Sequence, residues 1–101
     1  MRRRIEQIPR QPETDQWGWA KGKGKRKRCV AWAWVRAGKG GITVNGQPLL
    51  KYFKEAESRA HVVQPLNYGE YTGLVDVRII VRGGGLTGQQ KASGMAVARA
   101  L

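Results

Sequence analysis

The chain has 101 residues, a length that fits one domain with a modest hydrophobic core. Lysine and arginine number 19 against seven aspartates and glutamates, so the formal net charge of +12 favours a polyanionic partner that neutralises it. Nucleic acid is the leading partner class. An anionic membrane surface is the alternative, but we expect no membrane partner because the sequence contains no amphipathic basic helix. The single cysteine excludes an intramolecular disulfide and a multi-cysteine zinc site, and the single histidine argues against a histidine-based metal cluster or a Ser-His-Asp triad. No apolar run approaches the length of a membrane span.

Residues 1–28 hold ten of the 19 basic residues and show almost no apolar periodicity. We predict that they form an extended basic arm, which becomes ordered on its partner, ahead of a single domain over residues 29–101. Glycines between the lysines let the backbone approach phosphates, and the cationic side chains neutralise them. A solvated tail is the alternative. The predicted RNA contacts of the arm are Lys21, Lys23, Lys25, Arg26, Lys27 and Arg28.

Residues 29–35 alternate with a period of two, which predicts a strand that is apolar on both faces. A turn over residues 36–41, a second strand over residues 42–44 and the turn pair Asn45-Gly46 complete a predicted hairpin. Trp32 and Trp34 share one face of the first strand, and we expect them to pack under a helix rather than to stack on bases. Trp17 and Trp19 remain open between contact with RNA and contact with a neighbouring protein.

The second half of the chain predicts three helices and a strand. A short helix follows Pro48, a second helix runs from about residue 55 to residue 63 and ends before Pro65, and residues 66–73 form a loop. Residues 74–82 form a strand with one apolar and one charged face, and a last helix covers about residues 88–101. The predicted fold class is α/β (α+β), a two-layer sandwich of a β-hairpin and a β-α-β-α unit, with helices on one face of the sheet.

Residues 83–88 match Gly-x-Gly-x-x-Gly between a strand and a helix. A dinucleotide site also needs a second parallel strand and an acidic ribose ligand, and the remaining 13 residues supply neither. We therefore favour a tight turn whose amides point at an RNA phosphate, with a purely structural turn as the alternative. The turn at Gly38-Lys39-Gly40 lacks the ending of a phosphate-binding loop, so RNA contact and a plain turn remain open there.

No constellation of acid, base and nucleophile is present, so we expect no enzymatic activity, cofactor, metal or small-molecule substrate. His61 has no partner at metal spacing, and Cys29 next to Arg28 has no acid-base group around it. Glu55 and Glu57 do not form a pair of carboxylates for acid-base chemistry, because a spacing of two residues places them on different sides of a helix.

Several motifs occur in an order that resembles the family of the ninth protein of the small ribosomal subunit, in its bacterial and organellar form. They cover most of residues 17–101 and are Gly24-Lys25-Arg26-Lys27, residues 38–46, Tyr52-Phe53, Gln64-Pro65-Leu66, residues 81–89 and residues 98–101. The lead-in at residues 15–18 is most similar to alphaproteobacterial and mitochondrial members.

The resemblance implies a left-handed β-α-β crossover and a structural role in the head of the small subunit. The implied partners are small-subunit ribosomal RNA and neighbouring head proteins. Lys25, Arg26 and Lys27 match the family's basic run, Arg82 stands where lysine is usual, and Gln89 matches the family glutamine. Beyond the arm, the predicted RNA contacts are Arg36, Lys39, Arg82, Gly83, Gly84, Gly85, Gln89 and Lys91.

The chain departs from the family pattern in three places. Trp32 replaces an arginine, residues 90–96 replace a segment that carries an arginine and a histidine (with Lys91 as a partial substitute), and the chain stops at Leu101 before the family's basic tail. We therefore predict a mitochondrial ribosome, with plastid and bacterial cytoplasmic ribosomes as alternatives. For the tail, two interpretations stay open: the chain performs only the structural role, or a separate chain supplies the tail. The alternative function is a free nucleic-acid-binding module, such as a nucleoid or RNA-processing factor.

Overall fold

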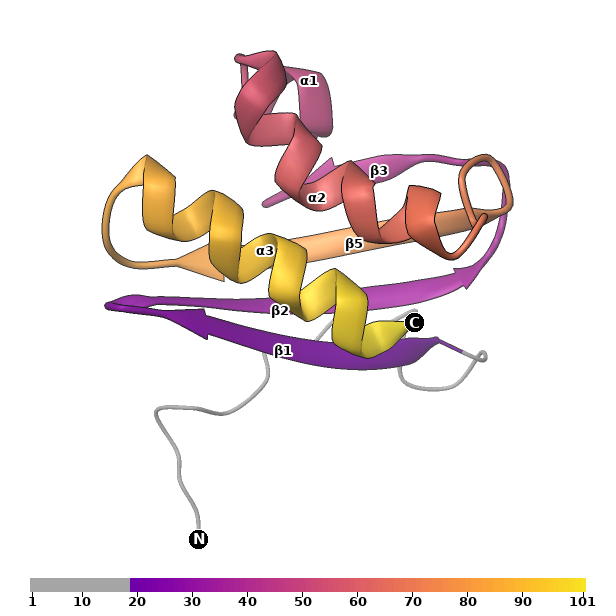
Figure 1. Ribbon diagram of the computed structural model, residues 1–101, viewed down its shortest axis with the longest axis horizontal. Coiled ribbons are helices and arrows are strands. Elements are labelled where there is room, and N and C mark those ends of the chain that lie inside the picture. Colours follow the sequence, from indigo (N-terminus) through magenta and orange to yellow (C-terminus); the bar gives the residue numbers. More distant parts are fainter. Residues whose placement is uncertain (1–18) are drawn as a thin grey trace, which may run out of the picture.

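A computed structural model describes residues 19–101 as a five-stranded sheet with helices on one face (Figure 1). The strand order across the sheet is β1-β2-β5-β3-β4, in which β3 and β5 are parallel and the other neighbours are antiparallel. This arrangement confirms the predicted two-layer α/β class. In chain order the elements are β1 (Ala20–Arg26), β2 (Cys29–Ala37), β3 (Ile42–Val44), β4 (Gln47–Pro48), α1 (Leu49–Tyr52), α2 (Ala56–Tyr68), β5 (Val75–Arg82) and α3 (Leu86–Ala100).

The first strand lies where the sequence analysis placed a detached arm. Ala20–Arg26 pairs with β2 over its whole length, so the arm prediction is wrong for these residues. The alternation of lysine and glycine is a strand pattern with a period of two, because successive residues point to opposite faces of the sheet. The rest of the predicted arm, residues 1–18, lies outside the described residues, as do Trp17 and the lead-in at residues 15–18.

Helix α3 lies directly on β1, and the two glycines of β1 make this contact possible. A Cβ atom at Gly22 would lie 2.3 Å from the Ala96 carbonyl oxygen, and one at Gly24 would lie 2.2 Å from that of Ala92. The guanidinium of Arg99 also donates a hydrogen bond of 2.9 Å to the Lys23 carbonyl. Only a residue without a side chain fits between the strand and the helix at these two positions.

The close contact between α3 and β1 also determines which face of β2 carries its large side chains. Cys29, Ala31 and Ala33 face the helices and belong to the core, while Trp32 and Trp34 lie in register with Lys23 and Lys21 on the opposite face. Both tryptophans are buried, but the prediction that they pack under a helix is wrong. The space beneath α3 is too shallow for an indole, and small side chains fill it instead.

The predicted hairpin between residues 29–35 and 42–44 is also wrong. β5 lies between β2 and β3 and pairs with both of them. The chain instead forms one hairpin from β1 and β2, through the turn at Lys27 and Arg28, and a second from β3 and β4 through Asn45-Gly46. Helices α1 and α2 connect the parallel strands β3 and β5, as a β-α-β crossover requires.

Helix α2 continues beyond the proline that was expected to end it. Pro65 lies inside the helix, which runs to Tyr68. Leu66 is almost fully buried in the core, and its carbonyl accepts a hydrogen bond of 2.8 Å from the Tyr71 amide. The last turn is therefore held by packing that outweighs the proline's missing amide, which a local rule for helix ends does not include.

The apolar face of β5 forms the centre of the core, as predicted. Val77, Ile79 and Val81 are buried against α3 and α2, and Val44 and Phe53 close the far side. The short helix after Pro48 is present as α1, and α3 begins at Leu86, two residues earlier than expected.

We expect Gly24→Ala to lower the free energy of unfolding by about 2 kcal/mol, because its methyl group needs the space that the Ala92 carbonyl occupies. Urea unfolding followed by tryptophan fluorescence measures the change. Gly41→Ala is the control, since its methyl group would lie at an ordinary distance of 3.5 Å from Asp76, and we expect a change below about 0.5 kcal/mol. Equal losses in both variants would contradict the close-packing explanation.

Candidate nucleic-acid interface

Two turns meet at one end of the sheet and enclose a hollow. The β1–β2 turn contributes Lys27 and Arg28, and the link from β5 to α3 contributes the glycines, around a cavity of about 420 Å³. We call this hollow the glycine-turn pocket. Its lining residues are Lys27, Arg28, Cys29, Gly84, Gly85, Leu86, Thr87 and Gly88.

The glycines are required by the backbone of this turn. Gly83 and Gly84 have φ angles of 87° and 53°, a region that side chains disfavour. A Cβ atom would lie 2.3 Å from the Arg28 carbonyl oxygen at Gly83 and 2.4 Å from the Cys29 sulfur at Gly84. The triple glycine therefore has a structural role, since it lets the turn rest directly on the start of β2.

A chain of hydrogen bonds fixes the turn from the other side. The Gln89 amide group donates to the Gly83 carbonyl at 3.0 Å, and its oxygen accepts from the Tyr52 hydroxyl at 2.8 Å. Asn45 donates to both the Tyr52 oxygen and the Val81 carbonyl. The side chain of Gln89, which the sequence analysis assigned to RNA contact, thus holds the glycine turn in place.

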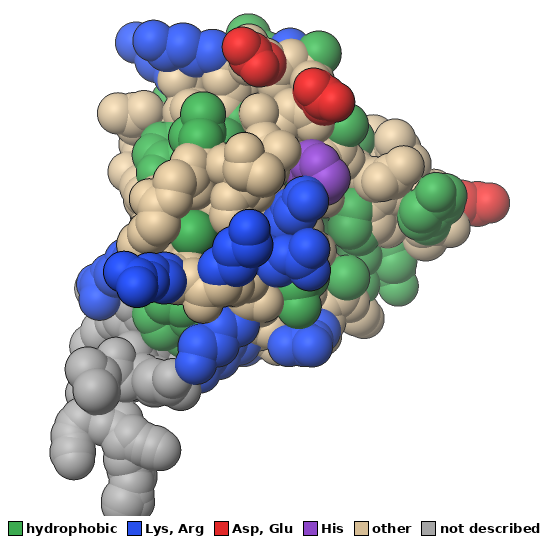
Figure 2. Space-filling model, turned by 60° about the vertical axis from the view of Figure 1, so that its left-hand side comes forward, with side chains coloured by type: hydrophobic (Ala, Val, Ile, Leu, Met, Phe, Trp, Pro, Cys, Tyr) green, Lys and Arg blue, Asp and Glu red, His purple; other side chains and the backbone are tan. Residues whose placement is uncertain are grey.

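The start of α3 makes this pocket electropositive. Gly85 caps the helix without any side-chain hydrogen bond, and the first turn carries no acidic residue. The first amides of a helix have no partner within the helix, and the helix dipole adds positive potential there. Lys27 and Arg28 are exposed beside these amides. Figure 2 views this end of the molecule and shows Lys and Arg side chains gathered across it, with the acidic side chains at its upper and right-hand margins.

A second group of basic residues lies on the sheet face that the helices leave uncovered. Lys21, Trp34 and Arg78 form one row across β1, β2 and β5, and Lys23, Trp32 and Ile80 form the next. We call this surface the Lys–Trp face. It comprises Lys21, Lys23, Lys25, Trp32, Trp34, Arg78, Ile80 and Arg82, and the pair Arg36 and Asp76 forms the next row at one end.

Trp19 joins this face through its ring. The guanidinium carbons of Arg36 and Arg78 lie 4.6 and 5.3 Å from the centre of its ring, and that of Arg82 lies 5.8 Å from the ring of Trp32. Cations at such distances from an indole face are attracted to it. Trp19, whose role the sequence left open, therefore holds two arginines in place.

The loop that carries Lys39 lies at the opposite end of the sheet. Asp76 organises it, since one carboxylate oxygen accepts hydrogen bonds of 3.0 Å from the amides of both Lys39 and Gly41. The Gly41 bond and then the Lys39 bond lower the pKa of Asp76 below its ordinary value, although burial opposes the shift. Eight residue steps along β2, or about 26 Å of strand, separate this loop from the glycine-turn pocket.

The predicted RNA contacts thus fall into separate groups. The structure brings Lys27, Arg28, Gly84 and Gly85 together, with Arg26, Arg82 and Gly83 next to them in the chain. It separates Arg36 and Lys39 from this group and places Lys21 and Lys23 on the Lys–Trp face. Lys91 is half-buried in α3. Sequence reasoning missed Arg78 as a candidate, although the period of β5 places it on the same face as Arg82.

Comparison with known proteins identifies the family. A profile of the family described as ribosomal protein S9/S16 matches residues 24–101. The chain belongs to this family. Among its relatives, the small ribosomal subunit protein uS9 of Chlorobium chlorochromatii is 46% identical over 72 residues, which are 71% of this chain and 56% of that protein. The proteins of the same name from Chlorobaculum tepidum and Cytophaga hutchinsonii are 45% and 42% identical over the same lengths.

This member of the S9/S16 family spans about half the length of the curated relatives it matches. Within residues 19–101, no three His, Cys, Asp or Glu side chains gather as a metal ligand set. None of the described helices combines the length and the apolar character needed to cross a membrane.

We expect Asp76→Asn to lower the free energy of unfolding by about 1 kcal/mol at pH 7, because the carboxylate stabilises two loop amides. Since the pKa is lowered in the folded state, this stabilisation is present above the unfolded pKa and disappears as the pH falls through the folded one. Urea unfolding at pH 7 and at about pH 2.5 should therefore show a larger loss of stability at pH 7 than in acid. Glu70→Gln, at an exposed carboxylate, is the control, and an undiminished Asp76→Asn effect in acid would refute the role of the charge.

Proposed function

We propose that this chain is a structural, non-catalytic component of the small ribosomal subunit that binds small-subunit ribosomal RNA. Membership of the S9/S16 family supports this class of function, and the relatives carry the name of a small-subunit protein. The observation that carries the proposal for this chain is the glycine-turn pocket, where two cationic side chains converge on the start of α3 without an acidic residue.

The pocket suits a phosphate of the RNA backbone. The free amides of the first turn donate hydrogen bonds to phosphate oxygens, and the helix dipole stabilises the negative charge. Lys27 and Arg28 add charge from the opposite wall, where an arginine can contact two oxygens at once. Because the glycines have no side chains, the phosphate can approach the backbone closely. Gln89 acts as a positioning residue in this scheme, through its bond to Gly83.

The remaining predicted contacts extend the interface beyond one phosphate. Lys21, Lys23 and Lys25 project from β1 toward the face away from α3, while Arg36 and Lys39 lie toward the other end of the sheet. Cations spread over two ends and one face suit RNA strands that converge on the protein, which would then hold folded RNA helices together. Neighbouring proteins of the subunit head are the further partners that we propose.

The same comparison bears on the compartment that we propose. The relatives reported above are bacterial, which supports the bacterial cytoplasmic ribosome, the alternative that the sequence analysis left open. The mitochondrial ribosome remains a proposal that depends on the lead-in at residues 15–18. Mass spectrometry of purified small subunits from the source cells would test it.

Sucrose-gradient fractionation of cells that produce the tagged chain tests the proposed function. We expect the chain in the small-subunit peak and its release from that peak in high salt, since phosphate neutralisation weakens as salt rises. Recovery of the chain only in ribosome-free fractions would contradict the proposal and favour a free nucleic-acid-binding module.

The double variant Lys27→Ala with Arg28→Ala tests the glycine-turn pocket. We expect weaker binding to small-subunit ribosomal RNA, and a slope of log affinity against log salt that falls by about 1 for each charge removed. Lys51→Ala with Lys54→Ala is the charge-matched control, since these lysines lie at and just after α1, away from the pocket. Equal effects of the two double variants would show that total charge, and not this pocket, controls binding.

A further inference from the structure

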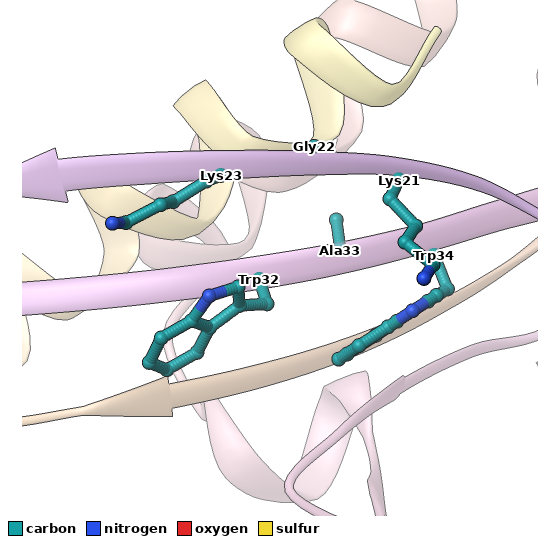
Figure 3. Close-up of a pocket in the computed structure, with 6 residues that line it drawn as sticks. All are labelled: Lys21, Gly22, Lys23, Trp32, Ala33 and Trp34. Atoms are coloured by element: carbon teal, nitrogen blue, oxygen red, sulfur yellow. The ribbon is translucent and has the colours of Figure 1, made fainter. Parts of the chain in front are cut away.

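A small cavity lies between the lysines of β1 and the tryptophans of β2, on the face away from α3. Its volume is about 170 Å³, and its walls are Lys21, Gly22, Lys23, Trp32, Ala33 and Trp34. Figure 3 shows both indole rings projecting from β2 on that side, with Lys21 reaching toward Trp34. A cavity of about 150 Å³ is large enough to hold one benzene ring, so this one can hold a single planar ring.

The indole N–H groups of the two tryptophans have no hydrogen-bond acceptor. Trp32 and Trp34 are 2% and 1% exposed, and neither ring nitrogen has a hydrogen-bond partner. A buried N–H without an acceptor destabilises the protein, and a tryptophan that is buried normally finds a partner for this group. Both residues line the cavity, so a ligand with acceptor atoms would satisfy these two N–H groups.

The surroundings of the cavity favour an anionic ligand. Lys21 and Lys23 form its rim, Arg82 lies against Trp32, and Arg78 stands next to Trp34 in the sheet. An unpaired nucleotide has the matching chemistry, because its base is planar and bears carbonyl acceptors while its phosphates are negatively charged. Proteins that bind single-stranded RNA combine aromatic side chains with basic residues in this way.

We propose that the Lys–Trp face binds an unpaired pyrimidine nucleotide of RNA, with the base in the cavity and its carbonyl oxygens accepting from the indoles of Trp32 and Trp34. A pyrimidine is chosen because its single ring matches a cavity of about 170 Å³. The flanking phosphates lie along Lys21 and Lys23. This inference rests on the proposed RNA-binding function and adds a single-stranded contact to the phosphate contact at the glycine-turn pocket.

Ultraviolet crosslinking of the full chain bound to small-subunit ribosomal RNA tests the proposal without any substitution. Trypsin cleaves after Arg28 and Arg36, and the resulting peptide of residues 29–36 contains Trp32 and Trp34 as its only aromatic side chains. Trypsin also releases residues 83–91, which report on the glycine-turn pocket. We expect a pyrimidine nucleotide adduct on peptide 29–36.

The two peptides separate the failure of this inference from the failure of the proposed function. An adduct on peptide 83–91 with none on peptide 29–36 would overturn the nucleotide site and leave RNA binding intact. A purine adduct on peptide 29–36 would overturn the proposed size selection. No adduct on either peptide, with no binding to the RNA, would overturn both proposals.

A variant measurement then tests the indole donors. Trp32→Phe with Trp34→Phe keeps two rings in place but removes both N–H groups, and we expect the affinity of the full chain for a uridine pentanucleotide to fall about tenfold. Affinity for an RNA duplex should change less than about twofold, because a paired base cannot enter the cavity. Tyr68→Phe, which removes an aromatic hydroxyl from the exposed end of α2, is the control. Equal losses for the single strand and the duplex would overturn the proposal.

Discussion

The close contact between α3 and β1 is the constraint on which the rest of the structure depends. It requires glycine at residues 22 and 24 and small side chains at Ala31 and Ala33, because the helix backbone occupies the space above them. The large side chains of β2 must then lie on the other face. The contact between α3 and β1 therefore makes the two faces of the sheet different. The face toward the helices carries glycines and small side chains in close packing, and the opposite face carries tryptophans and lysines.

The two sides differ in electrostatics as well as in packing. Lysines of β1 and arginines of β5 lie on the face away from the helices, while Glu55 and Glu57 lie at the start of α2 on the helical side. This separation sets a direction for the approach of a polyanion, which is attracted to the sheet and to its glycine-turn end. The cationic residues are held by the strands and by Trp19, so the charge pattern is fixed by the fold and not by long flexible side chains alone.

Sequence reasoning succeeded where a pattern reflects local geometry and failed where distant segments decide. The alternation in residues 74–82 gave the correct strand and the correct core face, and the glycines at residues 83–85 gave the correct turn. The glycines of β1 were interpreted as features of an arm, because nothing near them in the chain reveals that α3 lies against them. Pro65 was expected to end the second helix, but α2 continues to Tyr68 because Leu66 is buried in the core, and this burial is not visible from the local sequence. For the glycine-turn pocket, the sequence predicted the glycine turn but not its contact with the β1–β2 turn. The two turns are about 55 residues apart in the chain, and the order of strands in the sheet brings them together.

Cys29 gives this architecture a built-in reporter. Its thiol, the only one in the chain, is 1% exposed and donates a hydrogen bond of 3.1 Å to the Gly83 carbonyl beneath the turn. A reagent that alkylates thiols can reach the sulfur only when the turn lifts away from β2. The alkylation rate therefore measures how often that end of the sheet opens, and a phosphate that holds the turn closed would slow the reaction in proportion to its occupancy.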